Sequence, residues 1–315
     1  MKQIETTAHY GRGSYVATIG FFDGVHRGHR FLLEQLRQTA SRRGLPSLVI
    51  TFDNHPKTVV NPSHSMPLLS TSEEKLRLLD AQGVDNCVLL YFTPQMARLT
   101  AREFLEREIV GNLGVDTLLI GYDHRFGHDR REGFDDYVRY GNELGLSIQT
   151  VPSLAEVSGV QVSSTIIRNL LLNGRPEEAA VLLGRPYSLT GHVEQGHRIG
   201  RTFGFPTANL RLNDPLKLVP KRGVYAVRVT VNDEHEFLGM MNIGVRPTLH
   251  NGDNLSLEVN LFDYHGDLYA HRIKVQFLHF LRDERKFESL DALKNQITFD
   301  QAEIKEFFRS AHNKF

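Results

Sequence analysis

The chain has 315 residues, 40% of them hydrophobic, which is enough for about two domains of ~150 residues, each with its own core. Lys+Arg and Asp+Glu both number 37, and this balance excludes the overall positive field that attracts nucleic acid. A single cysteine excludes an intrachain disulfide framework. Because we find neither a signal-peptide pattern nor a run of ~20 apolar residues, we expect a cytoplasmic protein with no membrane partner.

The first half of the chain alternates apolar segments with amphipathic ones. Capping-box patterns from Thr71 to Glu74 and from Thr100 to Glu103 mark two helix starts. The alternation is typical of an α/β fold, here a Rossmann-like domain with a parallel sheet. Strands are predicted near 15–22, 46–52, 86–92 and 115–121, and helices near 29–43, 72–82, 101–113 and 134–144.

Three polar segments follow predicted strands and are expected to meet. In parallel α/β sheets, ligands bind beyond the carboxyl ends of the strands. Gly20–His29, Thr51–Pro56 and Gly121–Gly127 all fall at such ends. The sequence therefore predicts one ligand-binding crevice formed by these three segments.

The segment Gly20–His29 places two histidines and several glycines where a strand gives way to a helix. Free amides at a helix N-terminus attract anions, and His26 and His29, three apart on the first turn, would face the same ligand. Gly24 and Gly28 allow the backbone to approach it closely. This pattern suits a triphosphate. A structural zinc site is disfavoured because it needs four ligands and the only cysteine of the chain has no evident partner. The other alternative is a solvated turn that contains two histidines without a binding role.

After about residue 184 the apolar period becomes that of half-buried strands, as where Arg228 and Thr230 alternate with apolar neighbours. Such strands without long helices between them indicate a small antiparallel β-barrel. The breaker cluster Gly184–Pro186 predicts a boundary between domains 1–183 and 184–315. The spacing of Asp300 and Glu303 predicts that a terminal helix starts there, with a core-facing stripe of Ile304, Phe307 and Phe308. The predicted strands lie near 187–195, 222–231, 236–243, 255–262 and 271–281.

Several segments, taken in chain order, resemble the motifs of one family. They include Phe-Asp-Gly-Val-His-Arg-Gly-His at 22–29 and Gly-Phe-Pro-Thr-Ala-Asn at 204–209. Along almost the whole chain the sequence resembles the prokaryotic bifunctional riboflavin kinase/FAD synthetases. The resemblance implies that riboflavin and ATP give FMN and ADP in the C-terminal domain, and that FMN and ATP then give FAD and pyrophosphate in the N-terminal domain. The other segments that carry it are 51–56, 121–127, 163–168, 220–225, 242–248, Glu258 and 281–287.

For the N-terminal reaction the resemblance implies a site that aligns two phosphates and neutralises their charge. No hydroxyl has to be deprotonated, because the attacking group is the phosphate of FMN. His26 and His29 would bind ATP phosphates, and Arg168 would bind the departing pyrophosphate through its planar set of donors. Asn54 and Asp123 are equally compatible with ligand contact and with turn formation. Further expected nucleotide or flavin contacts are Gly20, Phe22, Asp23, Gly24, Gly28, Ser163, Ser164 and Thr165.

For the C-terminal reaction the resemblance implies a base, because the attacking group is a primary hydroxyl of riboflavin. Glu258 is the candidate base, although alone it would be read as an exposed strand carboxylate. Thr207 and Asn209 lie two apart, so an extended segment would turn both oxygens toward a Mg²⁺ ion bound to ATP. Gly196 and Gly204, with Gly200 between them, predict a loop over the nucleotide or ordinary hairpin turns. Arg282 and Phe287 are expected against the flavin.

The sequence departs from the family pattern at three positions. Ile166 replaces an arginine usual in the fourth motif, His124 stands where phenylalanine is common, and Asn260 where histidine is common. None of them carries a catalytic role in this interpretation. Two alternatives to the bifunctional enzyme remain: a chain that retains one activity, or a non-catalytic flavin-binding regulator.

Overall fold

The structure is a computed structural model that describes residues 1–4, 14–61, 66–121, 125–128, 132–152, 156–157, 159–194, 207–247 and 253–312. These residues form two compact units, Met1–Ser164 and Thr165–Phe315, which we describe separately. The division by contacts assigns residues 165–183 to the second unit. The domain boundary expected after residue 183 stays a prediction.

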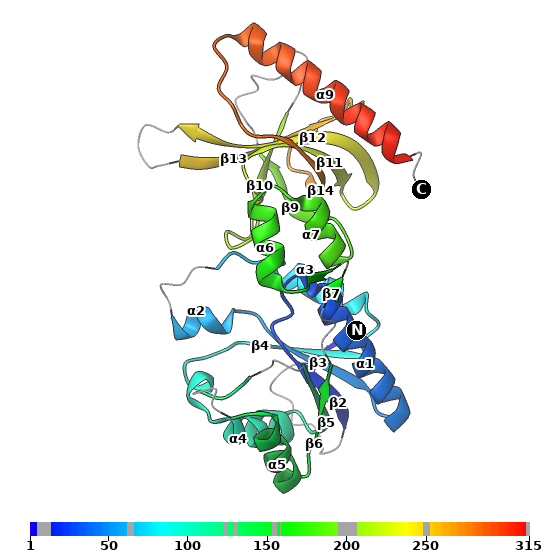
Figure 1. Cartoon of the computed structure of the whole chain (residues 1–315), viewed down its shortest axis with the longest axis vertical. Helices are drawn as coiled ribbons and strands as arrows, with labels where there is room; N and C mark the ends of the chain where they lie inside the picture. The colour runs from blue at the N-terminus through cyan, green and yellow to red at the C-terminus, as the bar shows by residue number, and fades with distance from the viewer. Residues whose placement is uncertain are drawn as a thin grey trace. The chain divides into compact units, whose positions relative to one another are not determined.

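The first unit contains a sheet of six strands in the order β1-β4-β3-β2-β5-β6, and every neighbouring pair is parallel (Figure 1). The predicted parallel α/β fold is thus confirmed. The sequence pattern does not predict the two edge strands, because β1 has three residues and β6 turns polar side chains outward. The strands are β1 (Lys2–Ile4), β2 (Tyr15–Ile19), β3 (Ser47–Phe52), β4 (Asn86–Leu90), β5 (Val115–Gly121) and β6 (Ser147–Val151).

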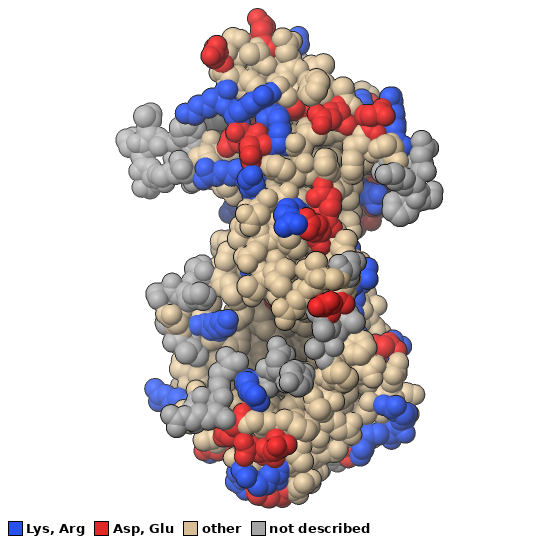
Figure 2. All heavy atoms as spheres, in the orientation of Figure 1, with Lys and Arg blue, Asp and Glu red and all other residues tan. Residues whose placement is uncertain are grey.

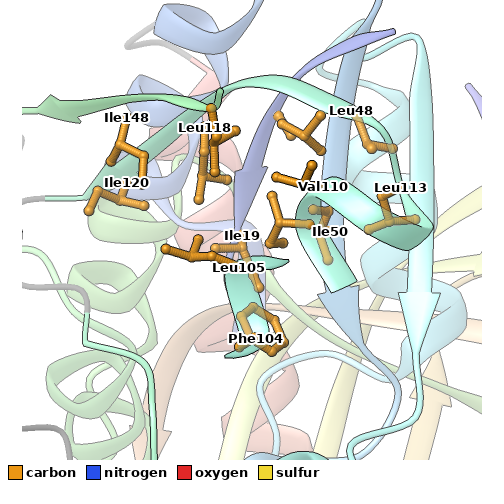
Figure 3. Close-up of a cluster of buried hydrophobic side chains, with 14 of the residues drawn as sticks. Ile19, Leu48, Ile50, Phe104, Leu105, Val110, Leu113, Leu118, Ile120 and Ile148 are labelled. Carbon is orange, nitrogen blue, oxygen red and sulfur yellow. The ribbon is translucent and has the colours of Figure 1, made fainter. Parts of the chain in front are cut away.

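Two hydrophobic cores show that helices cover both faces of this sheet. Leu33 and Leu36 of α1 (Arg27–Arg43) and Leu79 of α3 (Ser72–Asp80) pack in one core. The other core includes Phe104 of α4 (Ala101–Phe104), the π-helix η3 (Leu105–Asn112) and Tyr137 of α5 (Phe134–Leu144). Figure 3 shows part of it, where Ile50, Leu118 and Ile120 lie among the side chains from the helical layer. The remaining short elements are η1 (Asp23–Val25), α2 (Pro56–Val60), η2 (Met96–Arg98), β7 (Glu156–Val157) and β8 (Val160–Gln161).

Both predicted capping boxes are present. The Thr71 side chain accepts from the Glu74 amide and the Glu74 carboxylate accepts from the Thr71 amide, and Thr100 and Glu103 repeat this exchange. α1 ends at Gly44, whose positive φ of 65° lets its amide reach carbonyls of the last turn.

The second unit is a closed barrel with the strand order β10-β13-β12-β11-β14-β9, antiparallel throughout. The predicted barrel is confirmed, and β10 is a strand in addition to the five predicted ones. Two helices, α6 (Ser164–Leu172) and α7 (Pro176–Leu183), precede it in the chain. The strands are β9 (Tyr187–Glu194), β10 (Ala208–Leu212), β11 (Gly223–Val231), β12 (His235–Pro247), β13 (Asp253–Leu261) and β14 (Arg272–Arg282).

The terminal helix α9 spans Leu290–His312, so the start predicted at Asp300 is wrong. Asp300 lies inside the helix and is fully buried. The predicted stripe is confirmed, since Ile304 and Phe308 pack with Val224 of β11 and Met240 of β12 while Phe307 packs against this cluster. Among the described residues we find no helix of the length and apolarity that a membrane crossing requires. Figure 2 shows basic and acidic side chains interspersed on the face drawn.

Candidate active sites

The first and second motifs meet at the carboxyl ends of β2 and β3. The amide of Gly20 donates to the carbonyl of Ile50 at 3.0 Å, and the Thr51 hydroxyl donates to the carbonyl of Phe21 at 3.2 Å. β2 lies between β3 and β5, and the chain runs from β2 to β3 on one side and later returns to β5 on the other. The first motif therefore lies at the switch point of the sheet, where such folds bind ligands.

The turn from β2 into α1 has an unusual backbone. Phe22, Gly24 and Val25 have φ values of 54°, 77° and 39°. Only glycine adopts this region without strain, and a β-branched residue there is a real outlier. Val25 is fully buried and Phe22 nearly so, and both pack in the α1 core, which offsets the strain. The strained turn leads directly to His26, the N-cap of α1.

His26 and His29 stack on each other. Their ring centroids lie 3.6 Å apart at an interplanar angle of 16°, and the Nδ1 atom of His26 accepts from the His29 amide at 3.3 Å. One amide of the helix terminus is thus occupied by His26 and not free, contrary to expectation. A Cβ atom at Gly28 would lie 3.3 Å from the His26 ring, a tight contact that favours glycine beside the stacked histidines.

The surroundings of His29 favour the neutral form of its imidazole. Burial, and to a smaller extent His26, lowers the pKa of His29 well below its ordinary range. Its Nδ1 atom is buried and has no hydrogen-bond partner among the described residues, and Phe22 contacts the ring edge to face at 5.2 Å. A buried ring nitrogen without a partner is what a ligand hydrogen bond would satisfy. Permanent charge in this turn comes instead from Arg27 and Arg30.

Asp23 bonds to the protein in this structure. Its carboxylate is almost fully buried and accepts from the amides of Leu69 and Ser70 at 3.1 and 3.0 Å, while the Ser70 hydroxyl accepts from the Gly24 amide. The nucleotide contact expected of Asp23 stays a prediction. The contacts that the structure shows favour a structural role for the carboxylate.

Asn54 is likewise bonded to the backbone. Its amide nitrogen donates to the carbonyl of Phe92 at 2.8 Å, and its amide oxygen accepts from the Phe92 amide at 2.7 Å. These two bonds join the loops that follow β3 and β4. Of the two roles left open for Asn54, they favour the formation of loop structure.

Ser164, in the fourth motif, comes close to the first. Its hydroxyl donates to the carbonyl of Asp23 at 3.0 Å. Ser163 is partly buried beside it, whereas Thr165 and Arg168 belong to the second compact unit, in which Arg168 is 8% exposed.

The third motif is supported by a residue that the sequence does not single out. Tyr137 of α5 is fully buried, stacks on Phe126 at 4.1 Å, and its hydroxyl contacts both the amide and the carbonyl of Phe126. Arg125 is exposed and adds positive charge near this motif, while Arg130 and Arg131 are interpreted from the sequence as a solvated face. Asp123, Arg130 and Arg131 lie outside the described residues, as do Gly196, Gly200 and Gly204.

The barrel brings the predicted base and a predicted metal ligand together. Asn209 of β10 and Glu258 of β13 are direct partners across neighbouring strands, so their side chains leave the same side of the sheet. The Ser256 hydroxyl donates to the Glu258 carboxylate at 2.9 Å. Asn242 of β12, in the segment 242–248, is the partner of Glu258 on the other side, and no role is predicted for it from the sequence. Thr207 is exposed and precedes β10.

A pocket of about 360 Å³ adjoins this pair. Asn209 lines it from β10 and Ser256 from β13, with Glu194 and Arg211 forming an ion pair of 2.8 Å at its wall. The pocket therefore offers amide, hydroxyl and charged groups beside apolar walls. The other lining residues are Leu210, Leu212, Pro215, Lys217, Val219, Leu255 and Leu257.

Arg282 and Phe287 contact each other, with the guanidinium 5.9 Å from the ring centroid. The Arg282 guanidinium also bonds to the buried Asp300 carboxylate, at 2.6 Å for the shortest contact, and to the carbonyl of Asp283. The N–H groups of Arg282 thus donate mainly to other groups of the protein. The flavin contact predicted for Arg282 and Phe287 stays a prediction.

The oxygen donors of the barrel fit the ion that the resemblance implies. A hydroxyl from Thr207 and an amide oxygen from Asn209 are hard ligands, which Mg²⁺ prefers alongside phosphate oxygens and water. No group of three or more His, Cys, Asp or Glu in the described residues could bind a metal.

The first unit is a parallel α/β unit with a histidine-capped helix at its switch point, and the second is a closed barrel that pairs a carboxylate with an amide. Together these features define a two-domain enzyme of nucleotide chemistry. Comparisons with known proteins narrow this class. Residues 10–166 match the family model described as FAD synthetase, and residues 183–308 match that described as riboflavin kinase. The chain belongs to the bifunctional riboflavin kinase/FMN adenylyltransferase family, which confirms the resemblance found in the sequence.

Relatives of that description match almost end to end. The protein from Pseudomonas fluorescens is 40% identical over 287 residues, covering 91% of each chain. That from Escherichia coli (strain K12) is 40% identical over 293 residues, covering 93% of this chain and 92% of the relative. A crystal structure described as a macrolide-efflux protein from Streptococcus pneumoniae is similar to this chain with a TM-score of 0.87 at 32% identity, and the match covers 97% of this chain and 99% of that one.

Proposed function

We propose that this bifunctional enzyme of FAD biosynthesis performs its two reactions at separate sites. Riboflavin and ATP give FMN and ADP on the barrel, and FMN and ATP give FAD and pyrophosphate at the carboxyl end of the parallel sheet. The observation that carries the proposal is the pairing of Asn209 with Glu258 on the barrel wall, because it supplies a base and an oxygen ligand at one place. The stacked pair of His26 and His29 belongs to the other compact unit.

On the barrel, Glu258 would accept the proton of the primary hydroxyl of riboflavin as its oxygen attacks the γ-phosphorus of ATP. The bond to the bridging oxygen then breaks and ADP leaves. The Ser256 hydroxyl orients the Glu258 carboxylate. Thr207 and Asn209 would bind Mg²⁺, which supplies charge neutralisation of the ATP phosphates when bound. The adjoining pocket is large enough for part of a nucleotide.

At the parallel sheet, a phosphate oxygen of FMN would attack the α-phosphorus of ATP and pyrophosphate would leave. The neutral form of His29 would donate a hydrogen bond to a phosphate oxygen without adding charge, and its ring stacks on His26. Arg168 would stabilise the departing pyrophosphate. Gly20, Phe22, Gly24 and Gly28 are proposed to shape the backbone around the nucleotide, as the strained turn supports.

Two finer parts of the proposal rest on the resemblance of the sequence to the family. Gly196 to Gly204 would cover the nucleotide on the barrel, and Phe287 would contact the flavin. The single cysteine, Cys87, is fully buried and supports a reducing compartment such as the cytoplasm.

Product analysis tests the function directly. The purified chain is incubated with riboflavin, ATP and Mg²⁺, and the flavins are separated by chromatography. We expect FMN to appear first and FAD to follow. Formation of FMN without FAD would show that only the kinase is active, an outcome compatible with Ile166 in place of the usual arginine. If neither product forms, the flavin-binding regulator is the remaining alternative.

Two substitutions test the assignment of the sites. Glu258→Ala should reduce FMN formation at least about 100-fold, as expected for loss of a general base, while supplied FMN is still converted to FAD. His29→Ala should do the reverse. Rates of each half-reaction, measured separately with riboflavin or FMN as substrate, decide the matter, and loss of both activities in either variant would contradict separate sites.

A further inference from the structure

Lys75 is a buried lysine in the first compact unit that the proposed reaction does not use. Its side chain lies on α3 and the residue is only 2% exposed. Its Nζ atom donates to the carbonyl of Phe52, the last residue of β3, at 2.5 Å and lies 4.3 Å from the ring centroid of Phe21. Burial of an ammonium group costs free energy, so we expect Lys75 to have a role beyond packing.

The two contacts of Lys75 join two motifs. Phe21 belongs to the first motif, and its ring also meets His55 of the second motif edge to face at 4.3 Å. Phe52 lies at the start of the second motif, where β3 ends. Lys75 thus contacts both motifs where they leave the parallel sheet, at the ends of β2 and β3.

The segment that leads into α3 makes further bonds to the same two motifs. The Asp23 carboxylate accepts from the amides of Leu69 and Ser70. The Ser72 hydroxyl donates to the Asp53 carboxylate at 2.5 Å. The region from Leu69 to Lys75 therefore contacts both sides of the crevice while contributing none of the expected ligand contacts.

We propose that Lys75 is a positioning residue for adenylyl transfer, whose ammonium sets the spacing between the first and second motifs through Phe21 and Phe52. The inference rests on the proposed placement of that reaction at the parallel sheet. Lys75 touches neither nucleotide nor flavin in this proposal. Its effect on the reaction passes through the placement of His26, His29 and the loop after β3, where small displacements are costly.

The charge state of Lys75 gives the proposal a pH signature. Burial lowers the pKa of Lys75 to about 8, against the opposing effects of Asp23, Asp53 and the Cys87 thiol, which are the ionisable groups that face it. Above pH 8 the neutral amine can still donate to Phe52, but its attraction to the Phe21 ring is lost. Adenylyl transfer should therefore decline as the pH rises through about 8.

Stability should change in the opposite direction. Because the pKa of Lys75 is lower in the folded chain than its ordinary value of 10.5, the unfolded chain binds more protons between these two values. The contribution of Lys75 to the free energy of unfolding should then rise with pH in that interval, although burial raises the pKa of the Cys87 thiol from 9.0 to about 12 and opposes this rise above pH 9. A thermal midpoint measured at each pH separates a loss of adenylyl transfer from unfolding.

The test uses the full-length chain and its two half-reactions. Lys75→Met removes the charge and keeps the length, so we expect kcat/KM for FMN adenylylation to fall about 10- to 100-fold, with an unchanged or higher thermal midpoint and unchanged riboflavin phosphorylation. Lys75→Arg retains a charge at every pH, so its adenylylation should exceed that of Lys75→Met and lack the decline near pH 8. Arg77→Met, on the exposed side of α3, is the matched control and should change neither activity.

Three results would overturn the inference. These are full adenylylation in Lys75→Met, an equal loss of both activities together with a lower thermal midpoint, and an alkaline decline in Lys75→Arg identical to that of the wild type. Failure of the proposed function is distinguishable from all three, because the wild-type chain would then make no FAD.

Discussion

His279 on β14 illustrates how a single residue can join three elements of the barrel unit. Its Nδ1 atom lies 2.5 Å from the Glu177 carboxylate of α7, and its ring stacks on Phe307 of α9 at 4.9 Å and 14°. The hydrogen bond to Glu177 raises the pKa of His279. Since the folded pKa of His279 lies above the unfolded one and the pKa of Glu177 is lowered, the pair stabilises the fold fully between about pH 4.5 and 6.5. This contribution is lost as the pH rises through the folded pKa of His279 or falls through that of Glu177.

We expect Glu177→Gln to lower the pKa of His279. Both side chains are more than a third exposed, so the stabilisation should remain below about 1 kcal/mol. NMR titration of the histidine ring measures the pKa in both proteins. Glu178→Gln, which removes a neighbouring carboxylate paired with Arg175, is the control and should leave the titration unchanged. An unchanged midpoint in Glu177→Gln would contradict the assignment.

The sequence predicts residue types at a site better than their partners. Asp23 and Asn54 stand in motifs and are polar, which is equally consistent with ligand contact and with support of the backbone. Their partners, Ser70 and Phe92, come from distant segments, so only the fold reveals which groups are already bonded. For the same reason the pairing of Asn209 with Glu258 follows from strand register and not from spacing along the chain.

At the scale of elements, the contact between β14 and α9 includes a buried ion pair in addition to the stacking of His279 on Phe307 and the apolar cluster around Ile304 and Phe308. The Asp300 side chain is 1% exposed and that of Arg282 is 20% exposed. Asp300 also accepts from Gln296 one turn earlier in the helix. Removing the arginine would leave a carboxylate buried without its charge partner, whereas removing the carboxylate would leave a cation that can reach water.

We therefore expect Arg282→Met to destabilise the chain by about 3–5 kcal/mol and Asp300→Asn by less. Chemical denaturation followed by the circular dichroism of the barrel unit would measure both. The double variant Arg282→Met/Asp300→Leu should recover most of the stability, since it leaves no unpaired charge. If Asp300→Asn proved the more damaging change, the asymmetry of burial would not explain the pair.

The same ion pair explains why the start of α9 is not predictable from local pattern. Asp300 and Glu303 match the spacing of a capping box, yet Asp300 faces β14 because Arg282 is there. Long, periodic elements such as α1 and β11 are predicted well, whereas β1, β6 and β10 are short or polar. Their place is decided by neighbours in the sheet, which a local pattern does not contain.

At the scale of the whole molecule, three hydrophobic clusters of the described residues each lie within a single unit, two in the first and one in the barrel unit. Leu118 is fully buried in the first unit and Val227 in the barrel. The change from helical to strand periodicity near residue 184 can be predicted from the sequence, because each period extends over many residues and a few exceptions do not hide it. The separation of the cores predicts that damage to one leaves the other intact.

Leu118→Ala should cost about 2–5 kcal/mol by leaving a cavity under the parallel sheet. We expect adenylylation to be lost at a lower temperature while the inactivation temperature of the kinase is unchanged. Val227→Ala is the matched variant in the barrel and should give the opposite result. Thermal inactivation of each half-reaction measures this, and equal shifts of both activities in either variant would show that the units unfold together.

Asn209 and Glu258 are partners on neighbouring strands of the closed barrel, and this pairing also affects how the enzyme can change during evolution. The distance between the two side chains is set by the hydrogen-bond ladder between β10 and β13 and not by the chain that connects them. Connecting loops can therefore gain or lose residues, and so alter which flavins or nucleotides are admitted, without moving the reacting groups. A deletion of one residue inside either strand would instead turn one of the pair toward the barrel interior. Substrate range and chemistry are thus open to selection separately.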